Sequence, residues 1–156
     1  MDETIVETFN KYLDEDSILY HLGDFAFGLN NIYELRGKLK IKELILILGN
    51  HDKDIRKNKN GIQGLFTSVQ DVLNIKIDKN SFFLSHYAHL IWNQNHKGRY
   101  HLFAHSHNRL KSPMPRSMDV GIDVAYAKYG EYRPFHIDEI VEMLSKQELK
   151  IVDGHK

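Results

Sequence analysis

Apolar residues along the chain recur with two periods, one typical of helices and one typical of strands. Helical spacing is found at 3–13, 31–40 and 138–146. Short apolar or alternating runs, which predict strands, are found at 17–20, 43–48, 72–77, 81–84, 100–104 and, more weakly, 117–124. Asp2 is placed to cap the first helix. Strands interleaved with helices predict an α/β domain with layers of sheet and helix, and no linker divides residues 1–156.

Polar fragments follow several of the predicted strands. In chain order they are His21-Leu22-Gly23-Asp24, Gly49-Asn50-His51-Asp52, Ser85-His86-Tyr87 and His105-Ser106-His107. Polar residues just past neighbouring strands meet at one edge of a sheet, so we expect these side chains to converge. A carboxylate, an amide and several imidazoles together form an oxygen and nitrogen pocket suited to one or two transition metals.

The fragments differ in how specific they are. Gly-Asp alone is most often a turn, whereas Gly49-Asn50-His51-Asp52 directly follows a buried strand and is much rarer. His86 on its own is more often structural than a ligand. His105 and His107 could share one metal if the segment is extended, or serve neighbouring metals if it curls.

Composition narrows the choice of function. Lysine plus arginine equals aspartate plus glutamate, at 21 each, so charge does not indicate nucleic acid as a partner. Cysteine is absent, which excludes disulfides, thiolate zinc sites and cysteine nucleophiles. No apolar stretch reaches membrane-spanning length, and the start is unlike a signal peptide. We therefore expect a cytoplasmic protein with no membrane partner.

Taken in order, the series G-D, G-N-H-D, S-H-Y and A-H-S-H resembles the calcineurin-like metallophosphoesterase superfamily, in particular its small single-domain bacterial and phage phosphohydrolases. That resemblance implies a β-sandwich flanked by helices, with metal ligands on loops after strands. It implies that Asp24 bridges two divalent metals, that Asn50, His86 and His105 complete one site, and that His107 belongs to the other. His51 would contact the phosphate as the catalytic residue.

Two features depart from the family pattern. Ala104 stands where the family usually has glycine, which is harmless unless the residue needs a positive φ. The family also begins with a strand ending in Asp-x-His, and no Asp-x-His occurs in this chain. We therefore expect residues 1–156 to be one metallophosphoesterase domain that is N-terminally truncated relative to the family, with its first strand missing and its first metal site incomplete.

The function expected is metal-dependent hydrolysis of a phosphomonoester or phosphodiester by a metal-activated hydroxide. Manganese, iron or zinc suits the ligand set, with manganese favoured. Asn50, His51 and Arg109 are the candidate substrate-binding residues, and the substrate would be a small phosphoester or nucleotide. One alternative is a metal-binding or nucleotide-binding protein with impaired turnover. Another is a nuclease acting on a nucleic acid end, served by the basic stretch at 53–59 ahead of a mobile loop at Gly61 and Gly64.

Overall fold

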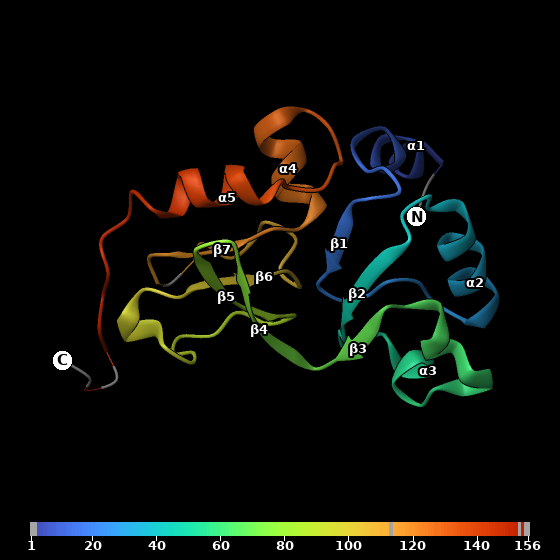
Figure 1. Cartoon of the computed structure of the whole chain (residues 1–156), viewed down its shortest axis with the longest axis horizontal. Coiled ribbons are helices and arrows are strands. Elements are labelled where there is room, and N and C mark those ends of the chain that lie inside the picture. The colour runs from blue at the N-terminus through green and yellow to red at the C-terminus, as the bar shows by residue number, and fades with distance from the viewer. Residues whose placement is uncertain (1–2, 113, 153, 155–156) are drawn as a thin grey trace.

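Two β-sheets and seven helical segments make up the computed structural model, which describes residues 3–112, 114–152 and 154 (Figure 1). The helices are α1 (Glu3–Tyr12), α2 (Leu29–Lys38), α3 (Lys53–Arg56), α4 (Ile122–Tyr129) and α5 (Ile137–Leu144), with 3₁₀ segments η1 (Lys59–Leu65) and η2 (Asn95–Lys97). The strands are β1 (Ile18–His21), β2 (Glu43–Ile47), β3 (Ser68–Gln70), β4 (Val72–Ile77), β5 (Asn80–Ser85), β6 (Tyr100–Phe103) and β7 (Ser117–Asp119).

The first sheet is parallel, with the order β1-β2-β3. Leu19 pairs with Leu44 and Ile45 pairs with Ser68, so the carboxyl ends of all three strands lie at the same edge. Leu44 and Leu46 are fully buried, and they pack in one cluster with apolar residues of α1 and α2 such as Phe9 and Ile32. This packing fixes the direction in which the loops after β1 and β2 leave the sheet.

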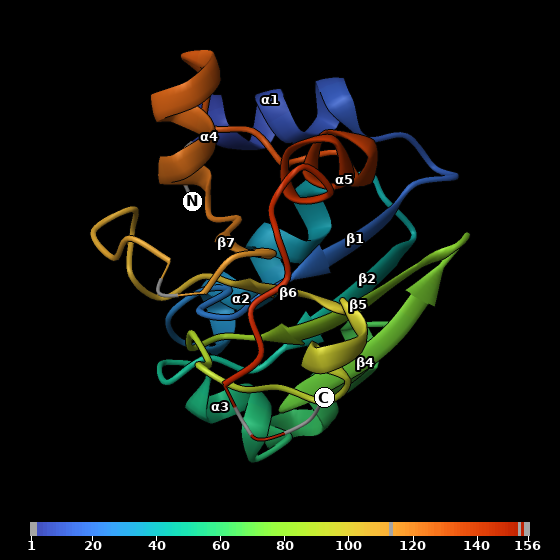
Figure 2. The same cartoon turned by 90° about the vertical axis from the view of Figure 1, so that its left-hand side faces the viewer.

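The second sheet has the order β4-β5-β6-β7. β4 and β5 form an antiparallel hairpin, whereas β5, β6 and β7 run parallel to one another. Phe82 and Leu102 of this sheet pack against Ile140 and Leu144 of α5. Figures 1 and 2 both show α1, α4 and α5 above the strands and α3 below them. The parallel arrangement again brings the loops after β5, β6 and β7 to one edge.

Most of the predicted elements are confirmed, and so is the mixed α/β class. The mobile loop predicted at Gly61 and Gly64 is wrong, because the 3₁₀ segment η1 spans both glycines and buries Ile62. The strand predicted over 117–124 ends at Asp119, and its last residues begin α4 instead. This helix buries Ala125 and ends at Tyr129, where Gly130 caps it with φ 78°. β3 was not predicted, and the Asp2 cap lies outside the described residues.

The helices of the described part of the chain are all too short or too polar to cross a lipid bilayer. The calcineurin-like β-sandwich and the cytoplasmic location stay predictions.

Candidate metal centre

Four predicted metal ligands lie together at the strand ends. Asp24 follows β1, Asn50 follows β2, His86 follows β5 and His105 follows β6. His86 Nε2 lies 2.9 Å from Asn50 Oδ1, 3.1 Å from His105 Nδ1 and 3.5 Å from Asp24 Oδ2. The ligand atoms of Asp24, His86 and His105 all lie within 4.8 Å of one another. Each loop thus contributes one donor atom to a common point.

The hydrogen bond of His86 to the backbone orients its ring for binding a cation. His86 is buried, and its Nδ1 lies 2.6 Å from the carbonyl oxygen of Leu22. Because a carbonyl oxygen only accepts hydrogen bonds, Nδ1 carries a proton, and Nε2 is the ring nitrogen that could bind a metal ion. Nε2 faces a carboxylate oxygen, an amide oxygen and an imidazole nitrogen. A metal ion would bind all four, and an N–H to carbonyl hydrogen bond on the far nitrogen is typical of metal-ligating histidines.

Two glycines allow the loops to approach this closely. A Cβ atom on Gly23 would lie 2.5 Å from His86 Nδ1 and 2.7 Å from the backbone of Gly49. A Cβ atom on Gly49 would lie 2.4 Å from Asp24 Oδ1. The glycines in the Gly-Asp and Gly-Asn fragments are therefore required by the packing of one loop on the next.

Asp52 connects the same two loops through its side chain. Its buried carboxylate accepts hydrogen bonds from the backbone N–H groups of Gly49 (2.7 Å), Asp24 (2.7 Å) and Phe25 (2.8 Å). The backbone N–H of His51 in turn donates to Asp24 Oδ1 at 2.9 Å. Asp52 acts as a positioning residue, and sequence reasoning missed this role although the residue belongs to the most specific fragment.

Several site residues have backbone conformations that residues other than glycine seldom adopt. The φ angles of Asp24, His105 and His107 are 56°, 48° and 49°. Such residues cost free energy and are concentrated at functional sites. Ala104 is not among the described residues with positive φ, so its side chain causes no backbone strain there.

The other predicted site residues lie around the cluster. The ring of His51 is exposed and contacts the ring of Phe27 edge to face. His107 curls away from His105, and its Nδ1 lies 2.9 Å from Asp123 Oδ2 on α4. The exposed Arg109 donates its backbone N–H to Ser106 in the same loop. The structure thus brings Asp24, Asn50, His86 and His105 together and leaves His107 with a different carboxylate.

A second set of acidic residues holds the His-Ser-His loop, and no motif in the sequence indicates it. Asp119, at the end of β7, accepts hydrogen bonds from the backbone N–H groups of Gly121 (2.8 Å) and Asn108 (3.1 Å). Burial raises the pKa of the Asp119 carboxyl above its usual value. Only the fold brings Asp119 and Asp123 beside the loop.

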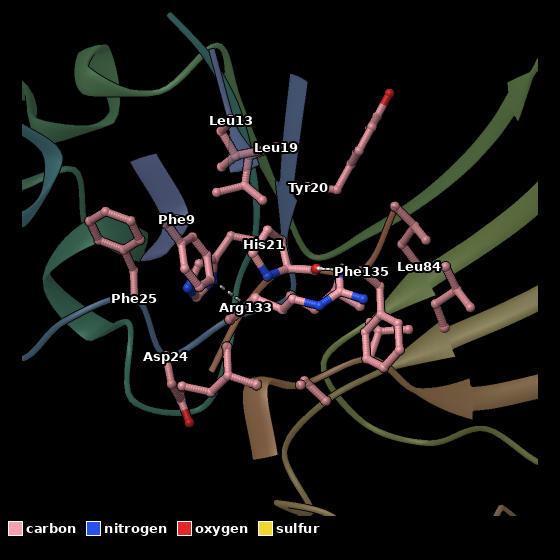
Figure 3. Close-up of a pocket in the computed structure, with 18 of the residues that line it drawn as sticks. Phe9, Leu13, Leu19, Tyr20, His21, Asp24, Phe25, Leu84, Arg133 and Phe135 are labelled. Atoms are coloured by element: carbon pink, nitrogen blue, oxygen red, sulfur yellow. Dashed lines mark hydrogen bonds between the residues drawn. The ribbon is translucent and has the colours of Figure 1, made fainter. Parts of the chain in front are cut away.

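A cavity of about 920 Å³ opens beside the cluster and extends between the two sheets (Figure 3). Figure 3 shows His21 and Arg133 among the apolar side chains that line it, with Asp24 at its boundary. Burial lowers the pKa of His21, an effect that the carboxylates of Asp52 and Asp24 oppose. All four residues of β1 line the cavity, although their side chains alternate between faces. The cavity therefore runs along the edge of β1 that has no neighbouring strand in the sheet.

Fold and site together define a mixed α/β protein with a candidate metal centre on the loops after its strands. The chain is 25% identical over 154 residues to an uncharacterised protein of Methanocaldococcus jannaschii, a match that covers 94% of this chain and 76% of the relative. No family model matches it.

Two solved structures share the fold. A protein of unknown function from Aquifex aeolicus matches with a TM-score of 0.67 and 23% identity, over 89% of this chain and 82% of its own. An archaeal phosphodiesterase matches with a TM-score of 0.53 and 23% identity, over 76% of each chain.

Proposed function

We propose that this protein is a metal-dependent phosphoester hydrolase. The observation that carries the proposal is the convergence of acceptor atoms from Asp24, Asn50, His86 and His105 on one point. The fold it shares with an archaeal phosphodiesterase and the order of the polar fragments support the same reaction. Imidazole, amide and carboxylate ligands suit manganese, iron or zinc.

A bound divalent cation supplies positive charge for the phosphate oxygens and makes water nucleophilic near neutral pH. Asp24, Asn50, His86 and His105 would hold this ion. Asp24 is fixed by the His51 N–H at one carboxylate oxygen, which leaves its other oxygen directed toward His86. His86 is fixed by Leu22, so its ring cannot turn away. The ligand atoms are thus oriented before the ion binds.

His51 is the residue that we assign to the substrate. Its side chain is exposed beside the cluster, while its backbone is held to Asp24 at 2.9 Å. An imidazole in this place can hold a phosphate oxygen and donate a proton to the departing alcohol. Arg109, on the loop that carries His105, is a second candidate for binding the phosphate.

Within residues 3–112, 114–152 and 154, the ligand set for a second ion is incomplete. His107 faces Asp123, and the cavity along β1 lies beside Asp24. We propose that residues 1–156 bind about one ion per chain and have weak activity. The same observation favours, as a second candidate, a metal-binding protein with impaired turnover.

The test separates chemistry from metal binding with one substitution. His51→Ala should keep its manganese, because His51 is assigned to the phosphate, and should lose turnover by on the order of 10²–10⁴. The measurements are metal content and hydrolysis of bis(4-nitrophenyl) phosphate with manganese added. Loss of the metal in this variant would show that His51 is a ligand. Absence of metal-stimulated hydrolysis in the unsubstituted protein would refute the proposed function.

A further inference from the structure

Two aromatic side chains beside the metal centre are largely exposed. Phe27 is 63% exposed and lies three residues after Asp24, and Tyr87 is 50% exposed and directly follows His86. Burial of apolar surface stabilises a fold by about 25 cal/mol for each Å², and the exposed part of these two rings does not contribute this stabilisation. Single exposed apolar residues are common on proteins, so exposure alone assigns no role to these two.

Their contacts with the site distinguish them from other exposed rings. The Phe27 ring lies 5.3 Å from the His51 ring, centroid to centroid, at an interplanar angle of 63°. The Tyr87 ring lies 4.6 Å from the His105 ring and 5.1 Å from the His86 ring. Each exposed ring therefore touches an imidazole assigned to the metal or to the phosphate.

The backbone of each ring residue is also held in place. The Phe27 carbonyl accepts a hydrogen bond from Asn31 Nδ2 at 2.8 Å, and the Tyr87 carbonyl accepts one from Ser85 Oγ at 2.5 Å. Rings on fixed backbone that keep exposed surface are suited to binding a planar group, because little freedom is lost when that group stacks on them.

Phe27 and Tyr87 are connected to different parts of the centre. Phe27 contacts His51, whose N–H binds Asp24, while Tyr87 contacts the two imidazoles from β5 and β6. A phosphate bound at the centre would therefore place its organic substituents within reach of aromatic surface. A phosphodiester carries two such substituents.

We infer that Phe27 and Tyr87 form a stacking surface and that the substrates are phosphoesters of nucleosides, a substrate class that rests on the proposed function. Nucleobases are planar, and stacking on an aromatic side chain stabilises them without a need for a particular base. The number of lysines and arginines equals the number of aspartates and glutamates, so the chain has no excess of positive charge for binding many phosphates. This favours a mononucleotide or dinucleotide over a long nucleic acid strand.

The test compares two esters with the same leaving group, thymidine 5′-(4-nitrophenyl phosphate) and methyl 4-nitrophenyl phosphate. The measured quantity is the ratio of their kcat/KM values with manganese. Stacking of one base is worth about 1–3 kcal/mol, so Phe27→Ala or Tyr87→Ala should lower the ratio by about 5-fold to 150-fold. Tyr87→Phe keeps the ring and should keep the ratio. Tyr33→Ala, which removes an exposed ring on α2, is the matched control and should not change it.

Binding measurements separate this inference from the proposed function. Calorimetry of the manganese-loaded protein should show tighter binding of thymidine monophosphate than of methyl phosphate, with the preference reduced in Phe27→Ala or Tyr87→Ala. A preference for the nucleotide without hydrolysis of either ester would support the stacking surface and refute the hydrolase. Hydrolysis of both esters at a ratio that neither alanine substitution changes would refute the stacking surface alone. Binding of neither ligand would refute both.

Discussion

At the scale of single residues, the centre depends on small groups as much as on its ligands. Gly23 and Gly49 leave room for Asp24 and His86, and Asp52 binds three backbone N–H groups of the same two loops. A ligand atom moved by about 1 Å no longer meets the others, since metal affinity depends on ligand geometry. We therefore expect conservative changes at these positions to act on metal binding.

Gly49→Ala tests this dependence. Its Cβ would lie 2.4 Å from Asp24 Oδ1 and 2.6 Å from the Asp24 backbone nitrogen, so the two loops must separate. We expect manganese affinity to fall by at least tenfold. Gly64→Ala is the matched control, because a Cβ there meets no atom within 4 Å and its affinity should equal that of the unsubstituted protein. Equal affinities for both variants, measured by calorimetry, would show that the close approach is unimportant.

At the scale of helices and strands, the sequence predicted the elements whose own residues determine them. β2 and α5 have strong apolar patterns and form where expected. α4 was mistaken for the end of a strand because Ile122 and Val124 alternate with a polar residue, whereas packing of Ala125 makes the segment helical. The ligand loops were predicted from their position after strands. The contacts of Asp119 and His107 depend on segments distant in sequence and could not be predicted.

β6 carries a histidine that should make stability depend on pH. His101 is fully buried; its Nδ1 lies 3.1 Å from the Phe83 carbonyl and its Nε2 accepts the His89 N–H at 2.9 Å. The neutral ring satisfies both contacts, whereas a proton on Nε2 would displace His89. Burial lowers the pKa of His101 to about 4. In the unfolded chain the pKa of this histidine is near 6.5. As pH falls from 6.5 to 4, the unfolded state therefore binds the proton more readily than the folded state does.

The sign of this linkage is a loss of stability on acidification. Between pH 7 and pH 5, His101 should remove about 2 kcal/mol from the free energy of unfolding of the metal-free protein. His101→Asn should be less stable at pH 7, and its stability should change less between the two pH values. Urea unfolding with a chelator present measures both. An unchanged pH dependence in the variant would show that His101 is not responsible.

At the scale of the whole molecule, the cavity between the sheets and the open edge of β1 lie beside the centre. The cavity is lined by apolar residues of both sheets, among them Leu19, Leu84 and Leu102. An added strand would pair with β1 and cover this surface, and its end would lie near Asp24. A strand that pairs with this edge and ends in Asp-x-His would add a carboxylate and an imidazole beside Asp24.

The open edge of β1 is tested by adding a strand to it. An apolar strand of about five residues that ends in Asp-x-His, joined before Met1, should raise the melting temperature and increase metal content from about one ion per chain toward two. Hydrolysis of bis(4-nitrophenyl) phosphate should rise steeply. The control extension carries Asn-x-Ala in place of Asp-x-His and should stabilise the fold without adding metal. If residues 1–156 alone bind two ions with equal activity, other residues complete the centre.

The most direct test of the metal centre is the metal content of purified variants. We expect the unsubstituted protein to hold about one manganese ion per chain after loading and desalting. Asp24→Asn should lose most of this metal, because it removes the carboxylate that lies 3.5 Å from His86 Nε2. His107→Ala should retain it, since His107 binds Asp123 instead. Equal metal content in Asp24→Asn and the unsubstituted protein would contradict the centre described here.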